Sequence, residues 1–198
     1  MKFEIDKKSG AGLALVAITF FGLGFAINTQ RDGDSFEHGG MHSSPSSKSE
    51  YSGDDIMFAQ MMIPHHQQAV EMSDLALKNS NNPQVLKLAE QIKAAQEPEI
   101  SQMKSWLSSA GQSLMGDHGM HMDGMLSDDE IEQLRQSTGI VFDKLFLTGM
   151  IAHHEGALSM VSMIKDSENE EAKTLAQNIK VSQSAEIDLM KRYLAELK

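Results

Sequence analysis

Two twelve-residue segments, residues 61–72 and 149–160, carry methionine and paired histidine at matching positions 88 residues apart. Thioether sulfur is a soft metal ligand, and imidazole nitrogen suits copper among other transition metals. We therefore interpret the shared side chains as candidate copper ligands. They are Met62, His65, His66 and Met72 in the first copy and Met150, His153, His154 and Met160 in the second, with Met61 as a weaker candidate.

The position three residues before the first histidine indicates which metal is favoured. Carboxylate-bridged di-iron bundles place a Glu there, in a Glu-x-x-His pair. This chain has Met62 before His65 and Met150 before His153. Replacing a hard oxygen by a soft thioether disfavours iron and favours Cu(I), while the imidazoles can also hold Cu(II).

Helical spacing brings each set of candidate ligands to one face. At about 100° per residue, the Met and His positions of each copy fall within one core-facing stripe. The stripe of a following helix repeats at an offset of 87 and carries polar residues, which need hydrogen-bond partners when they are buried. We interpret these residues as groups that hold the imidazole N–H groups. They are Gln96, Glu99, Gln183 and Glu186, and the same stripes add Met103 and Met190 as weaker metal candidates.

A whole helical hairpin is therefore duplicated. One hairpin cannot bury both of its apolar faces, so two packed together predict an all-α four-helix bundle over residues 54–198. We expect a first hairpin at 54–111 and a second at 127–198. Capping signals at Ser52, Asn82, Ser127 and Asn169 set the starts of the helices, and the helix with the second motif is expected to end near Lys165. Pro64 should kink the first helix or leave one of its carbonyl groups without a hydrogen bond.

Two further Met/His clusters lie outside the predicted helices. The segment 112–126 joins the hairpins, and its Gly and Asp residues argue against a packed core, so it predicts a flexible soft-metal strand. Its candidate ligands are Met115, His118, Met120, His121, Met122 and Met125. The linker 29–53 adds the weaker candidates His38, Met41 and His42.

Composition limits the partner and the compartment. The 198-residue chain has a formal charge of −11, which argues against nucleic-acid binding. It has 15 Met and no Cys, and thioethers persist in an oxidising compartment where thiolates would be lost. Residues 1–28 resemble an export signal with an apolar run at 11–27, and both a cleaved signal and an uncleaved membrane anchor remain open. We expect a periplasmic or extracellular protein.

The doubled Met-x-x-His-His-x-x-Ala arrangement, each copy opening a helical hairpin, resembles the ferritin-like family known as domain of unknown function 305. The resemblance covers residues 54–198. Within the family, the chain is similar to a cyanobacterial periplasmic copper-binding member. It implies copper sequestration outside the cytoplasm and resistance to copper stress, with a copper efflux or delivery protein as a candidate partner. The same Met and His positions of the two copies are the ligand positions that it implies.

Three hypotheses follow from the sequence. The leading one is an exported, non-enzymatic four-helix bundle that captures Cu(I), and secondarily Cu(II). The alternative is a ferritin-like metal oxidase, either a cuprous oxidase or a di-metal carboxylate site using Glu99 and Glu186, although one inward Glu per repeat is few for that pattern. The third is a membrane-anchored scaffold whose Met and His residues only fill its core.

Overall fold

The computed structural model describes residues 50–114 and 122–197, which lie within one compact unit, Ser46–Lys198. This part of the chain forms five α-helices and contains no strand. In order they are α1 (Gly53–Asn79), α2 (Pro83–Ser109), α3 (Asp128–Gln136), α4 (Gly139–Val161) and α5 (Glu170–Glu196). The predicted all-α bundle is therefore confirmed.

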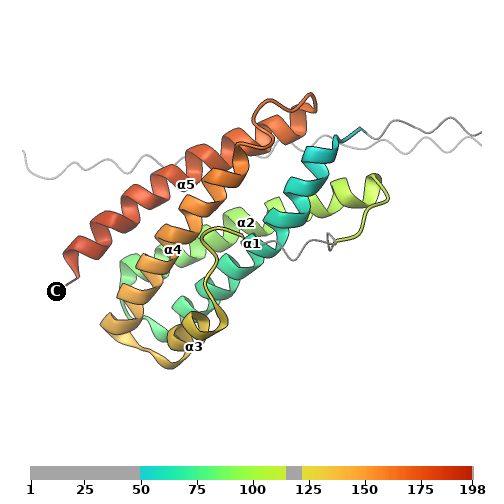
Figure 1. The fold of residues 1–198 in the computed structure, drawn as a ribbon. Coiled ribbons are helices and arrows are strands. Elements are labelled where there is room, and N and C mark those ends of the chain that lie inside the picture. Colours follow the sequence, from blue (N-terminus) through green and yellow to red (C-terminus); the bar gives the residue numbers. More distant parts are fainter. Residues whose placement is uncertain (1–49, 115–121, 198) are drawn as a thin grey trace, which may run out of the picture. The chain divides into compact units, whose positions relative to one another are not determined.

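The four long helices form two hairpins, and the motif helices are the pair that joins them (Figure 1). Helix α1 packs along α2, and α4 packs along α5. Across the two hairpins, α1 contacts α4 far more than α2 contacts α5. Both copies of the Met/His motif therefore lie on the two helices that face each other inside the bundle.

Side-chain caps fix where the helices begin. Ser52 and Ser127 each form a capping box, with Asp55 and Glu130 as the reciprocal partners. Asn82 and Asn169 occupy equivalent places in the two repeats, and their backbones are almost the same, with φ/ψ of −83°/117° and −82°/120°. These caps satisfy the free N–H groups of the first helical turn.

The structure bears on two local expectations, the effect of Pro64 on α1 and the end of α4. Helix α1 is continuous from Gly53 to Asn79 with Pro64 inside it. Helix α4 ends at Val161, before the predicted end near Lys165, and tighter i→i+3 turns continue the chain through Ser162, Met163 and Ile164. The sequence signal failed there because tighter turns keep the same apolar spacing for a few residues.

One end of the bundle is closed by aromatic residues. Tyr51 stacks on the fully buried Trp106, with ring centroids 5.3 Å apart. Both rings donate hydrogen bonds to Glu171 Oε2, at 3.3 Å from the Tyr51 hydroxyl and 3.1 Å from Trp106 Nε1. The contact ties the starts of α1 and α5 to the end of α2.

No helix in the two described ranges is long and apolar enough to cross a membrane. The apolar run at 11–27 and the linker 29–53 up to residue 49 lie outside those ranges.

We predict that Ser52→Ala lowers the free energy of unfolding by about 1 kcal/mol, because it removes the two hydrogen bonds of the Ser52 hydroxyl, which accepts from the Asp55 N–H and donates to the Asp55 carboxylate. Urea denaturation followed by circular dichroism measures the change. Ser101→Ala is the matched control, since Ser101 is exposed within α2 and bonds only the Glu97 carbonyl one turn earlier. Equal stability of wild-type and Ser52→Ala proteins would contradict the capping role.

Candidate metal centre

Four histidines lie in the interior of the bundle at repeat-equivalent positions. His65 and His66 come from α1, and His153 and His154 come from α4. All four side chains are 0% exposed. Buried imidazoles need partners for their ring nitrogens, so the contacts of each ring decide what the cluster can do.

His66 and His154 form an outer pair that is held by carboxylates. His66 Nε2 lies 2.8 Å from Glu99 Oε2, and His154 Nε2 lies 2.7 Å from Glu186 Oε2. The two glutamates are on α2 and α5, and their side chains are 16% and 18% exposed. A neutral imidazole that donates from Nε2 to a carboxylate keeps its lone pair on Nδ1. Neither Nδ1 atom has a hydrogen-bond partner.

His65 and His153 form an inner pair where the two repeats meet. Their ring centroids are 3.7 Å apart, and the ring planes are inclined by 36°. None of the four nitrogens in these two rings has a hydrogen-bond partner of standard geometry. Together with the two Nδ1 atoms of the outer pair, six buried ring nitrogens have no hydrogen-bond partner of standard geometry.

The inner imidazoles are neutral at ordinary pH. The pKa of His65 is lowered from 6.5 to about 3, mainly by burial and to a lesser extent by the neighbouring His66, while the backbone of Asp123 offsets part of this effect. Burial also lowers the pKa of His153 well below 6.5, and His65 acts in the same direction. Neutral imidazoles have a free lone pair, which is the form that binds metal ions.

The glutamines behave differently from the glutamates. Gln96 and Gln183 are each 2% exposed and occupy equivalent positions on α2 and α5. Neither amide atom of Gln96 has a hydrogen-bond partner, and the side-chain oxygen of Gln183 has none. Hydrogen bonds to imidazole are therefore made by Glu99 and Glu186, and the two glutamines add further polar atoms to the interior.

Methionines from both repeats gather in two buried clusters. The first contains Met62 and Met103 from one repeat with Met160 from the other. The second contains Met150 and Met190 with Met72. Exchanging the repeats converts one trio into the other, and His65 and His66 lie between Met62 and Met72 on α1. Soft sulfur therefore flanks the imidazoles on both sides.

The remaining predicted residues are more peripheral. Met61 and Met122 are partly buried against the first cluster. Met125 is partly buried and closes a turn by donating its N–H to the Met122 carbonyl. The other candidates lie outside the described residues: His38, Met41, His42, Met115, His118, Met120 and His121.

Within residues 50–114 and 122–197, no group of three or more His, Cys, Asp or Glu side chains is arranged to hold a metal ion. Imidazole and carboxylate groups alone therefore do not make a complete site in this part of the chain. Imidazole and thioether groups are both present in the interior of the bundle.

Sequence reasoning missed the backbone around Asp123, which lies beside the His65 ring, and the α1 residue Gln68, which holds this segment in place. The differences between the two copies of the Met/His motif are a sequence signal that could have indicated this contact. Where the first repeat has Met61 and Gln68, the second has Gly149 and Gly156.

We predict that the metal-free protein loses stability as the pH falls below about 6.5. His65 titrates near 6.5 when unfolded and near 3 when folded, so acid protonates the unfolded chain first. The stabilisation is complete above about 6.5 and is lost progressively towards about 3. Between about pH 7 and about pH 5 the loss from this residue is roughly 2 kcal/mol.

Urea denaturation of the wild-type protein and His65→Leu at both pH values isolates this contribution, because the other titrating groups are shared. The variant should lose less stability than the wild type over the same interval. Identical losses in the two proteins would show that His65 is not held neutral by burial.

Comparison with known proteins identifies a family and several similar folds. The family described as Domain of unknown function (DUF305) matches residues 55–194. No curated protein matches the chain. A DUF305 protein of Streptomyces coelicolor that is described as predicted to be secreted is 32% identical, with a TM-score of 0.69 over 72% of this chain and 93% of that one.

Two further solved structures are similar. A DUF305 fragment from Deinococcus radiodurans is 31% identical, with a TM-score of 0.69 over 74% of this chain and 99% of the fragment. CopM in its Cu(I)-bound form is 34% identical, with a TM-score of 0.61 over 72% of this chain and 96% of CopM. CopM has also been solved with Cu(II) and with silver bound. By its sequence match and by its fold, this chain belongs to the DUF305 family.

Proposed function

We propose that this protein binds copper ions outside the cytoplasm and sequesters them, without enzymatic turnover, as part of copper resistance or homeostasis. The observation that carries the proposal is the set of four buried imidazoles with six unpaired ring nitrogens between two methionine trios. Cu(I) is the favoured ion and Cu(II) the second.

The unpaired nitrogens argue for a ligand role. Each buried polar atom without a partner costs about 1–3 kcal/mol. Six such atoms at repeat-equivalent positions would be an unusual burden for a core that only had to pack. A bound cation would satisfy them, and Glu99 and Glu186 already orient two of the rings.

The type of donor argues for copper. Imidazole accepts several transition metals, whereas thioether sulfur selects soft ions such as Cu(I). His65, His66, His153 and His154, with Met62, Met72, Met150 and Met160, are the residues we propose as ligands, and Met103 and Met190 are secondary candidates. CopM, which is similar in sequence and fold, has been solved with Cu(I), Cu(II) and silver, and this supports the same class of ion.

The export proposal has separate support. The signal-like residues 1–28 favour export, and a composition of 15 Met with no Cys favours an oxidising compartment. The similar Streptomyces coelicolor protein is described as predicted to be secreted. In such a compartment the Met/His segment 112–126 would capture copper and exchange it with the bundle or with an efflux or delivery protein.

The oxidase alternative is less well supported by the geometry. A di-metal carboxylate site needs glutamate oxygens that bridge two metals. Here Glu99 and Glu186 each engage a different imidazole. Oxygen consumption during Cu(I) addition, above the uncatalysed rate, is the result that would favour an oxidase.

We predict that the double variant His65→Leu/His153→Leu binds Cu(I) at the bundle at least about 100-fold more weakly. Removing only the hydrogen-bond partner of a metal-binding side chain lowers metal affinity by about 10–100-fold, and removing the side chain itself should lower it more. Anaerobic titration against a competing chelator measures the affinity. Leucine fills the space of each ring, so circular dichroism should show an intact bundle. Ser73→Ala is the control, since it removes a buried, unpaired polar group from the same helix. Wild-type affinity in the double variant would refute the core site.

We also predict that Glu99→Gln lowers Cu(I) affinity by about 10–100-fold while the protein stays folded, because the amide orients the His66 ring less strongly than the carboxylate does. Glu97→Gln, an exposed change on the same helix, should leave the affinity unchanged. Glu186→Gln should match Glu99→Gln if the two repeats are equivalent at this position. An affinity within about twofold of wild type for Glu99→Gln would rule out a role for the carboxylate in orienting the ligand.

A further inference from the structure

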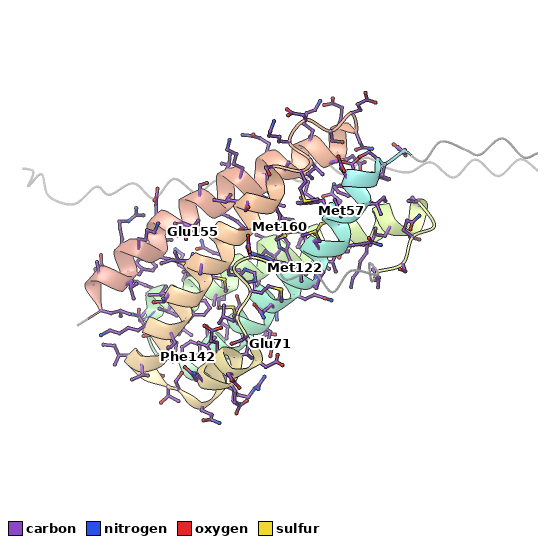
Figure 2. All side chains as sticks on the ribbon, viewed as in Figure 1. Met57, Glu71, Met122, Phe142, Glu155 and Met160 are labelled. Carbon is purple, nitrogen blue, oxygen red and sulfur yellow. The ribbon has the colours of Figure 1, made fainter. Side chains whose placement is uncertain are left out.

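Residues 122–126, here called the strap, cross the two motif helices on their way into α3. Figure 1 shows this yellow segment running over α4 and α1, and Figure 2 labels Met122 there. The strap has its own internal turn, in which Met125 N–H donates to the Met122 carbonyl. It touches both repeats at once, and the contacts on the two sides differ in kind.

On α1 the strap is held by one side chain. Gln68 Nε2 donates to the Leu126 carbonyl at 2.8 Å, and the Leu126 N–H donates to Gln68 Oε1 at 2.8 Å. The amide therefore pairs with both backbone groups of one residue, as a neighbouring β-strand would. Gln68 is partly exposed, so water can compete for both hydrogen bonds.

On α4 the strap packs directly against the helix backbone, because glycine residues leave room for it. A Cβ atom at Gly156 would lie 1.9 Å from the Asp123 carbonyl oxygen, which no packing adjustment of a side chain could relieve. Gly124 has φ of +84°, and a Cβ atom there would lie 2.4 Å from the Ala152 carbonyl oxygen. Backbone therefore meets backbone on this side.

The strap accounts for three of the differences between the two copies of the motif. Gly156 is the repeat equivalent of Gln68, and Gly149 is the equivalent of Met61. A Cβ atom at Gly149 would lie 3.0 Å from the Leu126 side chain. Ala152, the equivalent of Pro64, contributes the carbonyl that faces Gly124. These three of the six positions at which the copies differ lie under the strap, whereas the Met and His positions of the motif are unchanged.

The strap also covers the inner imidazole pair. The Asp123 and Gly124 backbone of the strap lies against Gly156 and Ala152 on α4, which flank His153. The His153 ring in turn lies against the His65 ring. Both rings are 0% exposed. The outer pair differs, because it reaches towards solvent through Glu99 and Glu186, which are 16% and 18% exposed.

We propose that the strap is a lid over His65 and His153 and that Gln68 is its latch, so that breaking the two Gln68 hydrogen bonds sets the rate at which an ion or solvent reaches the inner pair. The part of this inference that concerns the ion rests on the proposed copper function. Two hydrogen bonds to a partly exposed amide hold the strap only weakly, because water competes for them, so opening is rare but accessible.

Gln68→Ala tests the latch without metal. Hydrogen exchange of the Leu126 amide, followed by NMR, should become at least about tenfold faster relative to amides within α5, which report global unfolding. Modification of His65 and His153 by diethyl pyrocarbonate, located by tandem mass spectrometry, should speed up in parallel. Gln67→Ala changes the exposed neighbour on the same helix and should behave as wild type. Unchanged exchange and unchanged histidine modification in Gln68→Ala would overturn the proposal.

Gly156→Ala provides a second, independent test because it pushes the strap from the α4 side. It should accelerate the same two reactions, and slow modification of His65 and His153 in this variant would also overturn the lid. With Cu(I) supplied from a chelator in stopped-flow experiments, both variants should take up copper several-fold faster while binding the same number of ions. If the wild-type protein takes up no copper, the copper function fails, whereas exchange and modification still decide the latch.

Discussion

Burial of four imidazole rings is the constraint on which the rest of the structure depends. Burial lowers the pKa of His65 and His153, so these two rings are held neutral. Ring nitrogens that cannot reach water need partners inside the protein. Two rings obtain a carboxylate from the neighbouring helix of the same hairpin. The other two face each other across the repeats. The long helices, the duplicated hairpin and the flanking methionines all serve to keep this polar interior enclosed.

The same constraint explains why thioethers accompany the imidazoles. Methionine packs like an apolar residue and needs no hydrogen bond, so the two trios build a dry core without adding unpaired polar atoms. Sulfur nonetheless remains a soft donor. Carboxylates in the same places would each need a charged or hydrogen-bonded partner, and they would change the affinity from soft to hard ions. The methionine sulfur atoms can therefore pack in the core of the bundle without a hydrogen-bond partner.

Much of the fold could be predicted from residues alone, because the signals were local or repeated. The caps at Ser52, Asn82, Ser127 and Asn169 are short-range patterns, and each one begins a helix in the structure. The carboxylate partners of the imidazoles followed from helical spacing and the cost of burial. The strap could not be predicted in this way, since its contacts join residues 58 positions apart through backbone groups. The end of α4 was also missed, because a tight turn keeps the helical spacing.

The strap has a consequence for how such a protein can be assembled. The inner histidines meet at the pseudo-two-fold axis, so any segment lying over them lies over the axis itself. In a symmetric dimer of hairpins, each subunit would place its own copy there, and the two copies would occupy the same space. Joining the hairpins in one chain allows a single strap over the inner histidines, and the two repeats then differ in sequence where the strap contacts them. Gln68 and Gly156 record that loss of symmetry in the sequence.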